Sequence, residues 1–100
     1  MAKIKVAKLS ELQENQGKLV NVNEKEIALF KSNNQFFAVD NMCLHMGGSL
    51  SEGEIEGNNV TCPLHGWQFD LKSGQNIMPG MGKINTYKIT VEKDEIFIEI

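Results

Sequence analysis

The sequence predicts an all-β domain, an antiparallel barrel or sandwich with one short helix and one inserted, loop-rich subdomain. Apolar and polar residues alternate near both ends of the chain, as they do in half-buried strands. Between these ends, residues 40–82 contain most of the glycines, both prolines and four of the five methionines. A length of 100 residues and a hydrophobic content of 41% suit one domain covering residues 1–100.

The strands are expected to be short. In the first half of the chain they are predicted at residues 4–7, 18–22, 26–31 and 35–39. The last two form a hairpin, since Asn33 and Asn34 tolerate the left-handed conformation of tight turns. A second hairpin pairs residues 87–92 with residues 96–100 and turns at residues 93–94.

The single helix is expected to begin at Ser10. Ser10 and Gln13 fit a capping box, in which each side chain satisfies a backbone amide at the start of a helix. Gly17 suits the left-handed residue that commonly ends a helix.

All the cysteine and histidine of the chain lies in two similar motifs of the glycine-rich segment. One residue separates Cys43 from His45, and two separate Cys62 from His65. Two thiolates and two imidazoles are the ligand set of a Rieske 2Fe–2S cluster, in which two histidines replace two cysteines on one iron. We therefore predict that the cysteines bind one iron and the histidines the other. Residues 40–82 are interpreted as a cluster-binding subdomain that the cofactor helps to order.

These ligands predict one-electron transfer rather than catalysis, so no catalytic residue is assigned. Neutral imidazoles make the cluster less negative, and Rieske potentials span about −150 to +300 mV against about −400 mV for plant-type clusters. Gly47, Gly48 and Gly66 follow the histidines and let backbone amides approach the cluster sulfurs.

A zinc site is the main alternative for the same four side chains. Two cysteines and two histidines also form tetrahedral zinc centres. However, Cys–x–His is shorter than the usual zinc knuckle, and no helical histidine pair follows. Metal analysis separates the two interpretations.

The amino-acid composition restricts the classes of partner that this protein can bind. The net charge is −3 and all ten basic residues are lysines, which argues against a nucleic-acid partner. A mildly acidic surface suits docking on a basic partner, or simply solubility. We expect a cytoplasmic protein without membrane contact, because the sequence shows no signal peptide and no apolar run of spanning length. With both cysteines used as ligands, no disulfide is expected.

The two motifs resemble those of the Rieske family, in particular its small soluble ferredoxins. Residues 43–48 (CLHMGG) and 62–70 (CPLHGWQFD) carry the resemblance, and the flanking strands extend it over essentially the whole chain. It implies a Rieske-type fold with one 2Fe–2S cluster on Cys43, His45, Cys62 and His65. Residues 77–81, with Pro79, look like the proline-bearing loop that covers the cluster in this family.

The chain departs from the respiratory branch of that family at four positions. Gly48 and Leu64 stand where that branch has a pair of disulfide-forming cysteines. Trp67 and Phe69 stand where it has serine and tyrosine hydroxyls bonded to the cluster. Losing these donors disfavours the reduced state, so we expect a midpoint potential below about 0 mV, at the low end of the Rieske range.

The resemblance implies a carrier that takes electrons from a flavin-dependent reductase and passes them to a terminal oxygenase, as ferredoxin components of arene dioxygenases do. It is expected to be a monomer when free. The alternative is a Rieske-like small subunit of a nitrite reductase. A catalytic oxygenase is excluded, because its mononuclear iron needs two further histidines.

Two groups of residues are candidate docking surfaces. Four methionines near the motifs are predicted to form an apolar rim that either meets partners or only shields the cluster; they are Met42, Met46, Met78 and Met81. Glu52, Glu54 and Glu56 alternate along an expected strand, where they either meet a basic reductase or are merely solvated.

Overall fold

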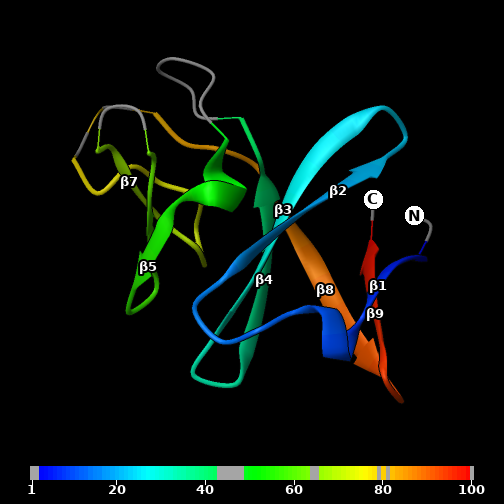
Figure 1. Cartoon of the computed structure of the whole chain (residues 1–100). Coiled ribbons are helices and arrows are strands. Elements are labelled where there is room, and N and C mark those ends of the chain that lie inside the picture. Colours follow the sequence, from blue (N-terminus) through cyan, green and yellow to red (C-terminus); the bar gives the residue numbers. More distant parts are fainter. Residues whose placement is uncertain (1–2, 43–48, 64–65, 79, 81, 100) are drawn as a thin grey trace.

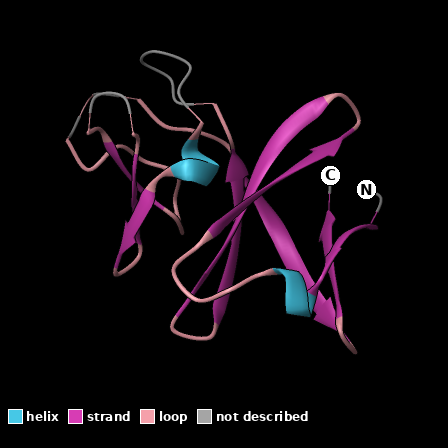
Figure 2. Cartoon of the chain, in the orientation of Figure 1, coloured by secondary structure: helices cyan, strands magenta, loops and turns pink. Residues whose placement is uncertain are grey.

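The computed structural model describes residues 3–42, 49–63, 66–78, 80 and 82–99, and antiparallel strands dominate this part of the chain. The strands are β1 (Lys3–Lys8), β2 (Gly17–Val22), β3 (Lys25–Ser32), β4 (Gln35–Asp40), β5 (Glu54–Glu56), β6 (Asn59–Thr61), β7 (Gln68–Asp70), β8 (Thr86–Glu92) and β9 (Glu95–Glu99). Two short 3-10 turns, η1 (Leu9–Glu11) and η2 (Leu50–Glu52), accompany them (Figure 2). The predicted all-β class is confirmed.

The strands form two sheets (Figure 1). Six of them, in the order β1-β9-β8-β4-β3-β2, curl into a nearly closed barrel-like sheet. The other three, in the order β5-β6-β7, form a small sheet on one side of it. Since β4 pairs directly with β8, the whole small sheet is inserted between two neighbouring strands of the larger one.

Both predicted hairpins of the larger sheet are present. Asn33 and Asn34 have φ values of 53° and 62°, so both adopt the left-handed conformation that suits a two-residue turn between β3 and β4. Lys93, at φ 56°, turns β8 into β9. The two hairpins therefore turn where the sequence predicts, at residues 33–34 and 93–94.

The predicted helix is wrong in position and length. The turn η1 begins one residue before Ser10, and the side chain of Glu11, not Gln13, accepts the backbone N–H of Lys8 at 3.2 Å. Leu12 returns to extended backbone and is buried, so packing of Leu12 ends the turn after three residues. Gly17 instead starts β2, where an added Cβ would lie 2.5 Å from the carbonyl oxygen of Ser51.

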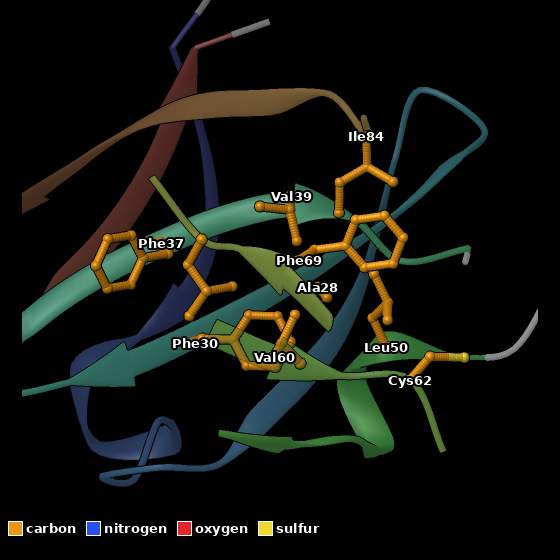
Figure 3. Packing of buried hydrophobic residues seen from close by; sticks show 10 residues of the cluster. Ala28, Phe30, Phe37, Val39, Leu50, Val60, Cys62, Phe69 and Ile84 are labelled. Carbon is orange, nitrogen blue, oxygen red and sulfur yellow. The ribbon is translucent and has the colours of Figure 1, made fainter. Parts of the chain in front are cut away.

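Strand β3 separates two apolar cores. Ile27 and Leu29 point into the barrel, whereas Ala28 and Phe30 point toward the small sheet, and all four are fully buried. The second core joins β3 and β4 to β6, β7 and the turn η2 (Figure 3). The small sheet therefore has a fixed apolar attachment to the barrel.

Among the residues that the structure describes, no helix has the length and apolar character required to cross a bilayer.

Candidate metal centre

One of the four predicted ligands lies in the described part of the chain. Cys62 directly follows β6, and its side chain is a buried free thiol, 1% exposed. Cys43, His45 and His65 lie outside the described residues. The structure therefore shows the setting of one ligand and the anchor points of the loops that carry the other three.

The second ligand loop closes the hairpin between β6 and β7. The backbone N–H of Cys62 donates to the carbonyl of Trp67 at 2.7 Å, and the N–H of Gly66 donates to the carbonyl of Cys62 at 3.0 Å. Gly66 has a φ of 73°, a conformation that other residues rarely adopt. These bonds hold Cys62 at the base of a short loop, as the Cys–x–x–His motif requires.

The first ligand loop has a polar clamp at its base. Buried Asn41 accepts the N–H of Leu50 on its backbone carbonyl at 2.8 Å and the N–H of Ser51 on Oδ1 at 2.8 Å. Its Nδ2 donates to Ser49 Oγ at 3.0 Å. Residues 43–48 are thereby flanked by two backbone segments that are bonded to each other.

The third predicted loop is attached to the second. The N–H of Ile77 donates to the carbonyl of Gln68 at 3.0 Å, and the N–H of Asn76 donates to the carbonyl of Gly82 at 3.0 Å. These bonds join Asn76 to Gly82 and Ile77 to the first residue of β7. Pro79 and Met81 lie outside the described residues, so the covering role of Pro79 stays a prediction.

The anchor points of the first and second loops converge in one core. Leu50, which follows the first loop, packs in the same buried group as Cys62 and Phe69 of the second (Figure 3). The predicted set of two thiolates and two imidazoles suits an iron–sulfur cluster or zinc. Among the described residues, which include only Cys62 of the four predicted ligands, no three potential ligating side chains gather.

One buried polar atom in this region lacks a hydrogen-bond partner. Asn76 is 6% exposed, and its Nδ2 is the orphan among the buried side-chain atoms described. Leaving such a donor unpaired costs about 1–3 kcal/mol. Cluster sulfurs accept hydrogen bonds, so an unpaired buried amide donor in the small sheet fits the presence of a 2Fe–2S cluster in this subdomain.

A second polar contact holds the strand that leads into the first ligand loop. The Tyr87 hydroxyl donates to Asp40 Oδ1 at 2.6 Å, and the Asn85 N–H donates to Asp40 Oδ2 at 3.1 Å. Burial and then this hydrogen bond to Asp40 raise the pKa of Tyr87 to about 12. Asp40 ends β4, so these bonds fix the strand end to β8 three residues before Cys43.

The structure bears on only some of the residues predicted to form docking surfaces. Met42 and Met78 are 60% and 54% exposed, and Ile77, which precedes Met78 in the chain, is exposed as well. Met46 and Met81 lie outside the described residues. Glu54 and Glu56 are exposed on β5 as expected, but the strand prediction is wrong for Glu52. Glu52 lies in η2, a turn closed by the N–H of Gly53, which donates to the carbonyl of Leu50 at 2.9 Å.

Trp67 and Phe69 occupy the positions where the respiratory branch has hydroxyls. Phe69 is fully buried in the core, and Trp67 packs against that core while partly exposed. Neither side chain carries a hydroxyl group. Sequence reasoning did not single out Asp40, Asn41 or Asn76; polar residues directly after an alternating strand, as in the pair 40–41, were the available signal.

Comparison with known proteins identifies the family. The profile of the Rieske [2Fe-2S] domain matches residues 2–88. The ferredoxin component of the naphthalene 1,2-dioxygenase system of Pseudomonas putida is 33% identical over 98 residues, which cover 97% of this chain and 94% of that protein.

Two solved structures are similar to this chain over nearly its whole length. In the structure of a complex of reduced oxygenase and oxidized ferredoxin of carbazole 1,9a-dioxygenase, one chain is 28% identical to this protein, with a TM-score of 0.87. The match covers 96% of this protein and 100% of that chain. A protein described as a nitrite reductase NADPH small subunit is 25% identical with a TM-score of 0.89, covering 100% of both chains. This chain therefore belongs to the Rieske [2Fe-2S] family, whose members are built around a 2Fe–2S cluster.

Proposed function

We propose that this protein is a one-electron carrier, with Cys43 and Cys62 on one iron of its cluster and His45 and His65 on the other. The cluster, when bound, accepts and releases a single electron. The observation that carries the proposal is the buried thiol of Cys62, held by backbone hydrogen bonds at the base of a tight hairpin loop. Family membership and the four-residue ligand pattern support it.

The residues of the chain supply position and shielding. Asn41 and its serine partners hold the base of the first loop, and the β6–β7 hairpin holds the second. The apolar core below Cys62 keeps water from one side of the site. We propose that residues 1–100 form a single Rieske domain and that residues 40–82 act as its cluster-binding subdomain.

The electron acceptor is proposed to be a terminal oxygenase and the donor a flavin-dependent reductase. The support is the likeness to ferredoxin components of dioxygenase systems, one of them solved together with its oxygenase. The exposed side chains of Met42, Ile77 and Met78 offer an adaptable apolar surface near the ligand loops. We propose a free monomer in the cytoplasm.

This proposal is tested by reconstitution. A flavin reductase, NADH and an arene dioxygenase oxygenase component are combined without their own ferredoxin, and product formation is measured as this protein is added. We expect turnover that rises with its concentration and is absent with the Cys62→Ser variant. No reduction of the iron-loaded protein by the reductase would contradict the carrier role.

A second candidate is a bound small subunit of a nitrite reductase. The full-length likeness to a protein described as such a subunit favours it. Purification of the native protein separates the two candidates. Elution as a free monomer supports the carrier, whereas stoichiometric elution with a larger nitrite-reducing subunit supports the alternative.

A further inference from the structure

We propose that Asn76 is a positioning residue for the cluster, with its Nδ2 group donating a hydrogen bond to a cluster sulfur and raising the reduction potential. This inference rests on the proposed function, since it requires the cluster. Four observations carry it: the strand register, the apolar neighbours, the orphan donor and the fixed orientation of the amide.

The register places Asn76 on the face of the small sheet that covers the core. Asn76 lies opposite Phe69. On one side of this pair the N–H of Asp70 donates to the carbonyl of Gln75 at 2.8 Å, and on the other side the N–H of Ile77 donates to the carbonyl of Gln68 at 3.0 Å. This pattern defines a non-hydrogen-bonded antiparallel pair, in which the two side chains are close and share a face. Asn76 therefore points to the same side as Phe69, toward the core that contains Cys62.

An amide is unexpected at that position. Ile55 pairs with Val60, and Val60 with Phe69, so Asn76 completes a row across the sheet whose other members are apolar. Val60 and Phe69 are fully buried, and Ile55 packs against the same core. Packing alone favours a fourth apolar side chain here, because a buried amide must find partners for both of its ends.

The orientation of the Asn76 amide follows from its oxygen. Oδ1 accepts the N–H of Met78 at 2.9 Å, a bond that only the oxygen can make, so Nδ2 is fixed at the other end. Nδ2 is shielded from solvent and lacks a partner. Bulk water does not reach Nδ2, so a partner buried beside it would complete its hydrogen bonding, and cluster sulfides are acceptors of this kind.

Such a bond has a defined effect on redox equilibrium. The reduced cluster is the more negative state, so a donor stabilises it more than the oxidised state. At a fixed solution potential, losing the donor should lower the ratio of reduced to oxidised protein about fivefold, which is about 40 mV at 59 mV per tenfold.

The test compares three variants of the iron-loaded protein by redox titration. Asn76→Ala removes donor and acceptor. Asn76→Ser keeps an oxygen that can accept the N–H of Met78 but stops short of the Nδ2 position. Ser73→Ala is the neutral matched control, since Ser73 Oγ accepts the N–H of Gln75, also two residues on, at 3.2 Å.

We expect both Asn76 variants to show the fivefold lower ratio and Ser73→Ala to keep the wild-type value. In pulsed EPR of protein grown with 15N-asparagine, a nitrogen coupling should disappear on Asn76→Ser. A wild-type midpoint in Asn76→Ser, or an equal shift in Ser73→Ala, would overturn the inference while leaving the carrier role intact. Absence of iron and sulfide from the wild type would instead overturn the proposed function itself.

Discussion

The hydroxyl of Tyr87 lies 2.6 Å from Oδ1 of Asp40, and this bond joins the beginning of β8 to the end of β4, just before the first ligand loop. Asp40 is the last residue of β4, and its backbone also pairs with Asn85, because its N–H donates to the Asn85 carbonyl at 3.0 Å. The two strands that border the inserted small sheet are thus tied together where the insertion begins. This junction lies three residues before the predicted ligand Cys43.

The Tyr87–Asp40 bond predicts a pH dependence at alkaline pH. The pKa of Tyr87 is raised from 10.0 to about 12. The unfolded chain therefore loses this proton first, and stability that is complete below pH 10 falls as the pH rises toward 12. Tyr87 is the single tyrosine of the chain, so phenolate absorbance reports its titration directly. A titration midpoint near 10 would contradict the bond.

The variant Tyr87→Phe supplies the control for this prediction. Phenylalanine keeps the ring but leaves Asp40 Oδ1 without its hydroxyl partner, so the free energy of unfolding at pH 7 should fall by about 1–2 kcal/mol. Urea unfolding at pH 7 and pH 11 measures both effects. The variant should lose less stability than the wild type between these two pH values, and equal losses would count against the assignment.

The clamp at Asn41 predicts an effect on cluster retention. Asn41→Ala leaves the part-buried N–H of Ser51 without its acceptor, so we expect stability to fall by about 1–3 kcal/mol and the cluster to be lost faster to a chelator. Loss of absorbance after adding the chelator measures the rate. Asn41→Asp keeps the acceptor for Ser51 and should retain the cluster better than Asn41→Ala. If both variants keep the cluster as long as the wild type, the clamp does not position the first loop.

Close packing at Gly17 predicts a specific loss of stability. An added Cβ would lie 2.5 Å from the Ser51 carbonyl oxygen and 2.6 Å from the Phe30 ring, and neither neighbour can move freely. Gly17→Ala should therefore cost about 1–3 kcal/mol, as overpacking commonly does, and thermal unfolding measures this loss. An unfolding temperature of Gly17→Ala equal to that of the wild type would contradict the packing argument.

The thiol of Cys62 predicts the simplest test of ligation. Cys62→Ser removes a proposed iron ligand with little change in volume, so we expect iron and sulfide to fall nearly to zero. Val60→Ala is the matched control, because Val60 is equally buried in the same core and is not a ligand. It should cost stability but keep the cluster. Normal iron and sulfide in Cys62→Ser would show that this thiol is structural.

Much of the fold followed from local sequence. Period-two alternation located the strands of both large hairpins, and Asn33 and Asn34 located one turn, because these signals depend on adjacent residues. The helix was misplaced for the same reason. The pattern around Ser10 satisfied a local rule, but burial of Leu12, which is set by the barrel, ended the turn earlier.

The site was only partly predictable. The ligand pattern is explicit in the sequence because cysteine and histidine occur nowhere else. The supporting residues were not visible in it, because Asp40 meets Tyr87 across 47 positions and Asn76 meets Phe69 only through strand pairing. Such contacts depend on register between distant segments, which a single sequence does not specify.

The central claim, a Rieske cluster on Cys43, His45, Cys62 and His65, is tested most directly by metal analysis with EPR. Protein expressed and purified anaerobically is assayed for iron, acid-labile sulfide and zinc, and the dithionite-reduced sample is examined by EPR. The account predicts about two irons and two sulfides per chain, since the cluster is 2Fe–2S, with a rhombic signal of low average g. One zinc per chain, without sulfide or signal, would contradict it and make the site a structural metal centre.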